Sequence, residues 1–314
     1  MSTPSNAVPE SFESQRVAPV VMSATQPMCW SLKRELWENR SIYIAPLAVG
    51  AIAMLGFLIS LLGLPHSMHD LAGLDPARRT VALAVPFAHV AMLLLLTEFL
   101  VGFFYCLDAL HSERRDRSIL FWKSLPVSDL TTVLSKAIIP LAVLPALTLA
   151  VTFILQVIML VLSTAVVVAS GAGAATMWAQ LPFVQIEVVL LYSVIVMVLS
   201  HAPIYGWLLL VSGWARRAPF LWAVLPLVAI SVLEGIAFRT WYFGKLLTNR
   251  LFGFVTDAFN FTLPDGRPID AHFIPVTQLT PGRFLSSPGL WIGLVFAAMF
   301  LAAAVRLRRY REPI

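Results

Sequence analysis

Six long runs of apolar residues organise the chain. Each is close to the roughly 20 residues that a helix needs to cross the hydrocarbon of a bilayer. We expect the spans at 42–64, 80–107, 137–169, 182–211, 219–238 and 288–305. The third and fourth share one uncharged stretch that is too long for a single helix, so we place a break at Ser170–Gly173. The pattern predicts an all-α integral membrane protein with six transmembrane helices.

The composition agrees with lipid as part of the solvent. The chain is 59% hydrophobic and 12% charged, whereas soluble domains carry about a quarter charged residues. No basic run is interleaved with aromatic residues, so we expect no nucleic-acid partner. Cys29 and Cys106 both fall near the predicted cytoplasmic face, without clustered histidines. We therefore expect neither a disulfide nor a metal site.

Basic residues set the predicted orientation. With both termini inside, fifteen of the 22 Lys and Arg residues lie in cytoplasmic segments, as the excess of basic residues in cytoplasmic loops requires. We expect a multi-pass protein of the cell membrane, in bacteria the inner membrane, with both termini cytoplasmic. Residues 1–27 are rich in Pro, Ser, Thr and Ala and lack an apolar core. They are expected to form a disordered cytoplasmic tail.

The segment before the first span, residues 28–41, has the pattern of an interfacial helix. Placed at about 100° per residue, its apolar side chains share one arc, namely Cys29, Trp30, Leu32, Leu36 and Trp37. Lys33 and Arg40 fall inside this arc, where their stems can lie on lipid while their charges reach the head groups. The alternative is a cytosolic helix that docks on protein.

The predicted cytoplasmic loop, residues 108–136, combines a charge cluster with bulky apolar residues. Glu113–Arg117 alternates in charge, and Phe121 and Trp122 follow within a few residues. Ser128 can cap the helix that leads into the third span. Apolar groups rimmed by paired charges are typical of a protein-docking surface. The alternative is a basic anchor whose aromatic side chains lie in the bilayer interface.

Residues 113–136 resemble the corresponding segment of type-2 ATP-binding-cassette (ABC) export permeases, through Glu113-Arg114, a short apolar helix, Leu125–Ser128 and a Lys before the next span. In many members a small Gly-Thr pair follows the Glu-Arg, where this chain has Asp116-Arg117-Ser118. The resemblance implies a coupling helix that sits in a cleft of a partner ATPase. It also implies six spans, an elbow helix before the first span, and short re-entrant helices between the fifth and sixth.

On this resemblance residues 28–311 form the permease domain, with an elbow helix at 28–41, a coupling loop at 108–136 and a re-entrant outer segment at 239–287. The residues expected to contact the ATPase are Glu113, Arg114, Arg115, Asp116, Arg117, Phe121, Trp122 and Lys123. The expected partners are ABC ATPase subunits, a second permease chain in a homodimer, and membrane lipid. Residues 239–287 have an alternative too, a small extracellular cap folded on itself.

The chain lacks a G-x-x-x-x-G-K-[ST] phosphate loop. We therefore expect it to be no enzyme and to hold no cofactor, with ATP and Mg bound by the partner ATPase. The alternatives are a secondary transporter or a membrane-embedded enzyme without an ATPase. The sequence shows no three-plus-three repeat, which would favour a secondary transporter. It shows no H-E-x-x-H motif, which would favour a membrane-embedded enzyme.

Glu98 lies in the cytoplasmic half of the second predicted span, deeper than Glu187 and Glu234, which are near the outer ends of theirs. A charge at mid-bilayer costs roughly 2.5–3.5 kcal/mol even on lenient scales, so such groups face protein or water. Glu98 could pair with an Arg, carry a proton, or line a substrate path.

Overall fold

The computed structural model describes residues 26–63, 75–116, 127–169, 178, 181–261 and 274–310. Within these ranges every regular element is a helix, and the only β pairing is an isolated bridge between Phe259 and Leu279. Six of the described helical segments are long and apolar enough to cross a membrane. They are α2 (Ser41–Leu61), α4 (Pro76–Ala109), α7 with α8 (Asp129–Ala169), α10 (Phe183–Trp214), α11 (Pro219–Phe238) and α15 (Pro288–Tyr310). The predicted all-α architecture with six apolar helices is confirmed.

The third span is a continuous helix with a local change of winding. It consists of α7 (Asp129–Ile138), the π-helical turn η1 (Ile139–Val143) and α8 (Leu144–Ala169). Ser128 caps its start as predicted, since its hydroxyl accepts a hydrogen bond from the Thr131 backbone N–H at 3.1 Å. Pro140 lies in the π-helical turn, where the wider winding accommodates a residue that has no N–H to donate.

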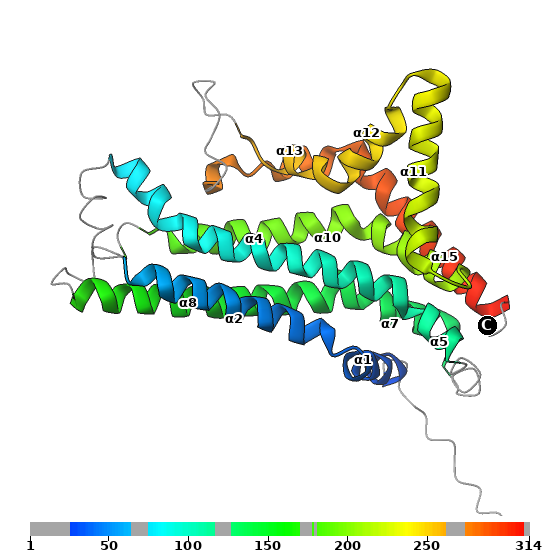
Figure 1. Ribbon diagram of the computed structural model, residues 1–314, viewed down its shortest axis with the longest axis horizontal. Coiled ribbons are helices and arrows are strands. Elements are labelled where there is room, and N and C mark those ends of the chain that lie inside the picture. Colours follow the sequence, from blue (N-terminus) through cyan, green and yellow to red (C-terminus); the bar gives the residue numbers. More distant parts are fainter. Residues whose placement is uncertain are drawn as a thin grey trace, which may run out of the picture.

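Helices α2, α4, α8 and α10 run side by side along the long direction of the molecule (Figure 1). Their packed core includes Leu94 and Met159 at one level and Cys106 and Leu208 at another, all buried. Helix α15 packs closely on α10: Gly206 of α10 lies against the backbone of Ala297, where an added Cβ would be 3.2 Å from the Ala297 carbonyl oxygen. In Figure 1, α11 runs across the direction of α4 and α10, and Ala223 is its one buried residue.

One end of the bundle gathers α1 (Gln26–Glu38), α5 (His111–Arg115), α7 and the C-terminal end of α15 (Figure 1). Helix α1 is seen nearly end-on in this view, so its axis lies across the long direction of the bundle. This is the end predicted to be cytoplasmic. At this end α1 packs on α7, and α7 packs on α15.

The described part of the segment between α11 and α15 is helical and packs on α10. It contains α12 (Tyr242–Thr248), η2 (Asn249–Gly253), α13 (Phe254–Ala258), the short turn η3 (Val276–Gln278) and α14 (Pro281–Ser286). The ring of Phe254 lies 5.1 Å from that of His201, and the ring of Phe259 lies 5.4 Å from that of Tyr192. The segment therefore follows α10 from its middle toward its N-terminal end.

Glu234 fixes the turn that leads from α11 into this segment. Its carboxylate accepts hydrogen bonds from the Thr240 hydroxyl and from the backbone N–H groups of Tyr242 and Phe243, at 2.7–2.9 Å. These N–H groups belong to the first turn of α12, which has no partner for them within the helix. Arg239 takes a left-handed conformation, with φ at 54°, that reverses the chain between the two helices.

Candidate functional site

Glu113 of α5 lies at the centre of a group of buried charges. Its Oε1 atom is 3.0 Å from Nη2 of Arg34 and 3.2 Å from Nζ of Lys136, and its other oxygen pairs with Arg308. The Glu113, Lys136 and Arg308 side chains are all buried, whereas Arg34 is partly exposed. A single carboxylate thus joins three cations from α1, α7 and α15.

Two further carboxylates complete the group. Oε1 of Glu35 lies 2.7 Å from Nζ of Lys136, and the hydroxyl of Tyr105 donates to Oε2 of Glu35 at 2.9 Å. On the other side, Nε of Arg308 donates to Oδ1 of Asp129 at 3.1 Å. The charge cluster, as we call it, consists of Arg34, Glu35, Glu113, Asp129, Lys136 and Arg308. Its three acids and three bases balance, which buried charges require.

The charge cluster also stabilises the charged form of Arg34. Burial by itself disfavours the charged form of Arg34, but the hydrogen bond to Glu38 and the charges of Glu113 and Glu35 outweigh burial and raise the pKa of the guanidinium. Arg34 therefore stays ionised at any physiological pH. The same side chain bridges the outer edge of the charge cluster, because its Nε atom donates to Glu38 at 2.8 Å.

Arg114 secures α5 to the end of α10 instead of joining the charge cluster. Its guanidinium donates to the backbone carbonyls of Gly213 at 2.8 Å and Ala215 at 3.4 Å. The Ser212 hydroxyl in turn accepts hydrogen bonds from the backbone N–H groups of Leu110 and His111. The last carbonyls of a helix lack partners within it, so a basic side chain is well placed there.

The predicted coupling residues fall into three groups. Glu113 and Arg114 are buried and bonded within the chain, as described above. Arg115 and Asp116 form an exposed pair at 3.1 Å. Arg117, Phe121, Trp122 and Lys123 lie outside the described residues.

Sequence reasoning missed most of the charge cluster. Glu35, Asp129 and Arg308 were not singled out, and Lys136 entered only as the Lys before the third span. Lys136 did carry a signal, since it directly precedes an uncharged stretch of the third span. Its partners could not be found from spacing, because Glu35 and Glu113 are far from it along the chain.

Glu98 is buried between α4 and α8, with 1% of its surface exposed. Its Oε2 atom and the Thr148 hydroxyl of α8 are both buried, and among the described residues neither makes a hydrogen bond of standard geometry, although the two side chains interact with each other. Among the described residues no Lys or Arg pairs with Glu98. Thr148, Thr152 and Gln156 follow one another at helical spacing on the buried side of α8. A polar seam therefore runs through the α4–α8 contact inside the predicted membrane region.

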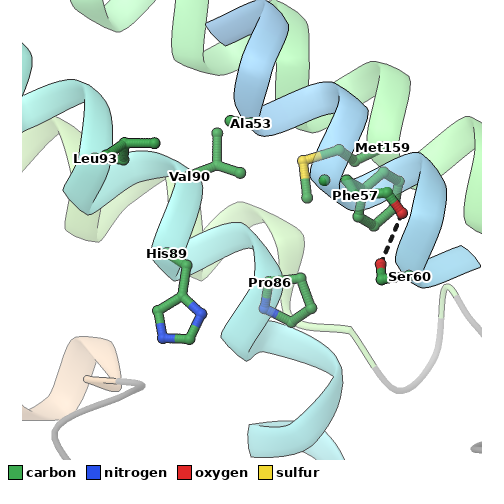
Figure 2. Close-up of a pocket in the computed structure, with 9 residues that line it drawn as sticks. Ala53, Phe57, Ser60, Pro86, His89, Val90, Leu93 and Met159 are labelled. Carbon is green, nitrogen blue, oxygen red and sulfur yellow. Dashed lines mark hydrogen bonds between the residues drawn. The ribbon is translucent and has the colours of Figure 1, made fainter. Parts of the chain in front are cut away.

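A groove of about 350 Å³ opens between α2 and α4 near the predicted outer end. Its walls are largely apolar, with Phe57, Pro86 and Met159 among them (Figure 2). The Ser60 hydroxyl donates to the Phe57 carbonyl at 2.7 Å, and His89 points away from Phe57 and Met159. Ser60 and His89 thus form no nucleophile and base pair, and the groove has the character of a surface for lipid chains.

Comparisons with known proteins assign no family. No family model matches the chain, and no curated protein or solved structure matches it significantly.

Proposed function

We propose that the chain is the membrane-spanning permease subunit of an ATP-driven ABC exporter. It works as a dimer with separate ATPase chains, which bind ATP and Mg. The six apolar helices and the resemblance of residues 113–136 to the coupling segment of type-2 permeases support this proposal. The chain performs no covalent chemistry; its task is to convert movement of the ATPases into movement of its spans.

The observation that carries the proposal is that the charge cluster joins the two helices that flank the 117–126 segment in sequence. Helix α5 ends at Arg115 just before the segment, and α7 begins at Asp129 just after it. Both flanks reach the same cation, because Arg308 of α15 pairs with Glu113 and with Asp129. Lys136 and Arg34 extend the connection to α1.

This arrangement supports transmission of movement from the segment into several spans at once. Separating a buried charge from its partner costs about 3–5 kcal/mol, so the helices that share the charge cluster move together more readily than they separate. A displacement of the 117–126 segment by the ATPase would then tilt α4, α7 and α15 together with α1. We propose that this tilt, against the dimer partner, opens the path outward.

The two finer features of the fold belong to the same proposal. Helix α1 is the elbow helix at the membrane interface, and α12, η2 and α13 form a re-entrant segment. The contact between Phe254 and His201 supports the second assignment: at a rise of about 1.5 Å per residue, His201 lies more than about 25 Å along α10 from Phe183, its predicted outer end. A cap outside the bilayer would not reach that depth.

Copurification from the native membrane tests the proposal. In mild detergent and with crosslinking, the chain should recover an ABC ATPase, and purified alone it should hydrolyse no ATP. Recovery of the intact chain without an ATPase would contradict the proposal.

A paired substitution tests the docking segment itself. Phe121→Ala with Trp122→Ala should dissociate or uncouple the ATPase, because truncating two interface aromatics can remove several kcal/mol of binding. The matched control is Phe220→Ala with Trp222→Ala, an exposed Phe and Trp at the start of α11. Assembly and transport that survive the first pair would refute the docking role, and loss in both pairs would point to a general effect of removing aromatics.

A further inference from the structure

Helix α1 turns two large aromatic side chains away from the protein. Trp30 is 70% exposed and Trp37 is 84% exposed. Cys29 and Lys33 are exposed beside them, and Nζ of Lys33 lies 5.7 Å from the ring centroid of Trp30. We call Cys29, Trp30, Lys33 and Trp37 the outward stripe. Its positions recur every three to four residues, so they occupy one face of the helix.

The charge cluster fixes the direction in which this stripe points. Glu35 lies on the opposite side of α1 and is held by Lys136 and Tyr105. Rotating α1 about its axis would break this buried pair. The outward stripe is therefore presented by a rigidly docked helix and not by a free tail.

The acidic residues Glu35 and Glu38 of α1 and its Arg34 are engaged in ion pairs, whereas Lys33 lies on the exposed stripe. Glu35 is buried in the charge cluster, and Glu38 is paired with Arg34 at 2.8 Å. Lys33 and Arg40, which follows α1 in the turn before α2, are both exposed. The outward side of α1 thus combines two Trp rings with the positive charge of Lys33, and the exposed Arg40 follows two residues after the helix ends.

The stripe also lies close in sequence to the start of the first span. The span α2 starts at Ser41, three residues after α1 ends at Glu38, and α1 runs across the long direction of the bundle (Figure 1). Trp side chains favour the membrane–water interface, and basic residues at the cytoplasmic surface are attracted by anionic lipids. We infer that the outward stripe, together with Arg40, is a binding surface for the head groups of anionic phospholipids.

This inference rests on membrane residence and not on the proposed transport function. The attraction between one basic residue near the surface and anionic lipid corresponds to an about fivefold local enrichment of that lipid. Lys33 and Arg40 should therefore enrich anionic lipid at least about fivefold over zwitterionic lipid.

The chain offers its own reporter for the test. Cys29 lies on the stripe and is exposed, whereas Cys106 is buried. A thiol-reactive fluorophore will therefore label Cys29 selectively in the full-length folded protein. The labelled protein is placed in nanodiscs of phosphatidylcholine and phosphatidylglycerol, in which either one or the other lipid carries bromine near the top of its acyl chains. Bromine quenches the fluorophore only at close range.

The same degree of fluorophore quenching should need a mole fraction of brominated phosphatidylglycerol at least about fivefold lower than that of brominated phosphatidylcholine. Lys33→Gln with Arg40→Gln should bring this ratio close to one. The control, Arg216→Gln with Arg217→Gln, removes two exposed basic residues between α10 and α11 and should leave the ratio unchanged. Continued protection of Cys106 from the thiol reagent verifies that each variant is folded.

Three outcomes would overturn the inference. Equal quenching by both lipids in the unchanged protein would show no selection for anionic head groups. An unchanged ratio in Lys33→Gln with Arg40→Gln would place the selection elsewhere. Absence of quenching by either lipid would show that protein, from a second copy or another chain, covers the stripe. None of these outcomes bears on whether an ATPase partner binds.

Discussion

Replacing Glu113 by Gln would remove the central charge of the cluster while keeping the shape of the side chain. Arg34, Lys136 and Arg308 would each lose one carboxylate partner. Each would keep another: Glu38 for Arg34, Glu35 for Lys136 and Asp129 for Arg308. The charge cluster would change from neutral to one net positive charge in a buried environment.

The retained pairs place the expected cost at the lower end of the range for breaking a buried ion pair. That range is about 3–5 kcal/mol, so we expect Glu113→Gln to destabilise the fold by about 3 kcal/mol. For a chain of this size each kcal/mol of lost unfolding free energy lowers the thermal midpoint by about 2 °C, so the midpoint should fall by about 6 °C.

Exposure of the Cys106 thiol is a direct assay for this loss. Cys106 is buried in the core near the charge cluster, so a fluorogenic thiol reagent will report unfolding once Cys29 is replaced by Ser. A double-mutant cycle of Glu113→Gln with Arg308→Met should give a coupling energy of about 0.5–3 kcal/mol, as for residues in one ion-pair network. Arg115→Gln is the control, because its pair with Asp116 is exposed, and its midpoint should match the unchanged protein. A midpoint for Glu113→Gln equal to that of Arg115→Gln, or additive effects in the cycle, would refute the charge cluster as a connection between helices.

Three further predictions concern other parts of the chain. Glu98→Gln should change the free energy of unfolding, measured by Cys106 exposure, by less than about 1 kcal/mol, because it alters no ion pair among the described residues. A loss of stability as large as for Glu113→Gln would reveal a charged partner. Ser128→Ala should lower stability by about 1 kcal/mol through loss of the cap on α7, and no change in midpoint would mean that the cap contributes nothing. Single cysteines labelled with a membrane-impermeant reagent should react weakly at 246–255, whose described helices pack toward the middle of α10, and strongly from outside at 264–268, which lies outside the described residues. Strong labelling throughout would refute the re-entrant placement, and labelling of 264–268 only from the cytoplasm would overturn the six-span topology.

The fold class could be read from local patterns because a bilayer imposes a local rule. Every span must be long enough and apolar enough to cross the hydrocarbon and to satisfy its own backbone hydrogen bonds. This rule identifies α2, α11 and α15 from composition alone. The start of the helix that leads into the third span is identified separately, by its capping residue Ser128. The boundaries were less certain: α4 begins at Pro76, several residues before the predicted span, because a helix can extend beyond the hydrocarbon.

The charge cluster could not be predicted in this way. Glu35 falls outside the apolar arc predicted for residues 28–41, on the polar side of that amphipathic helix, and a polar side usually faces water. In the structure that side faces Lys136, and the Trp side chains face outward. Amphipathicity identifies two faces of a helix, but it does not say which face meets protein, because that depends on charges from other helices.

The sequence by itself thus determined that this protein spans a membrane with six apolar helices, where the helix into the third span begins, and where charged and aromatic residues gather between the second and third spans. Only the tertiary structure decided that Glu113 lies inside the protein, paired with Lys136 and Arg308, and that Glu98 is buried against α8. The physical reason is the range of each interaction. Crossing a bilayer depends on about 20 consecutive residues, whereas a buried ion pair forms between side chains that only folding brings within a few ångströms of each other.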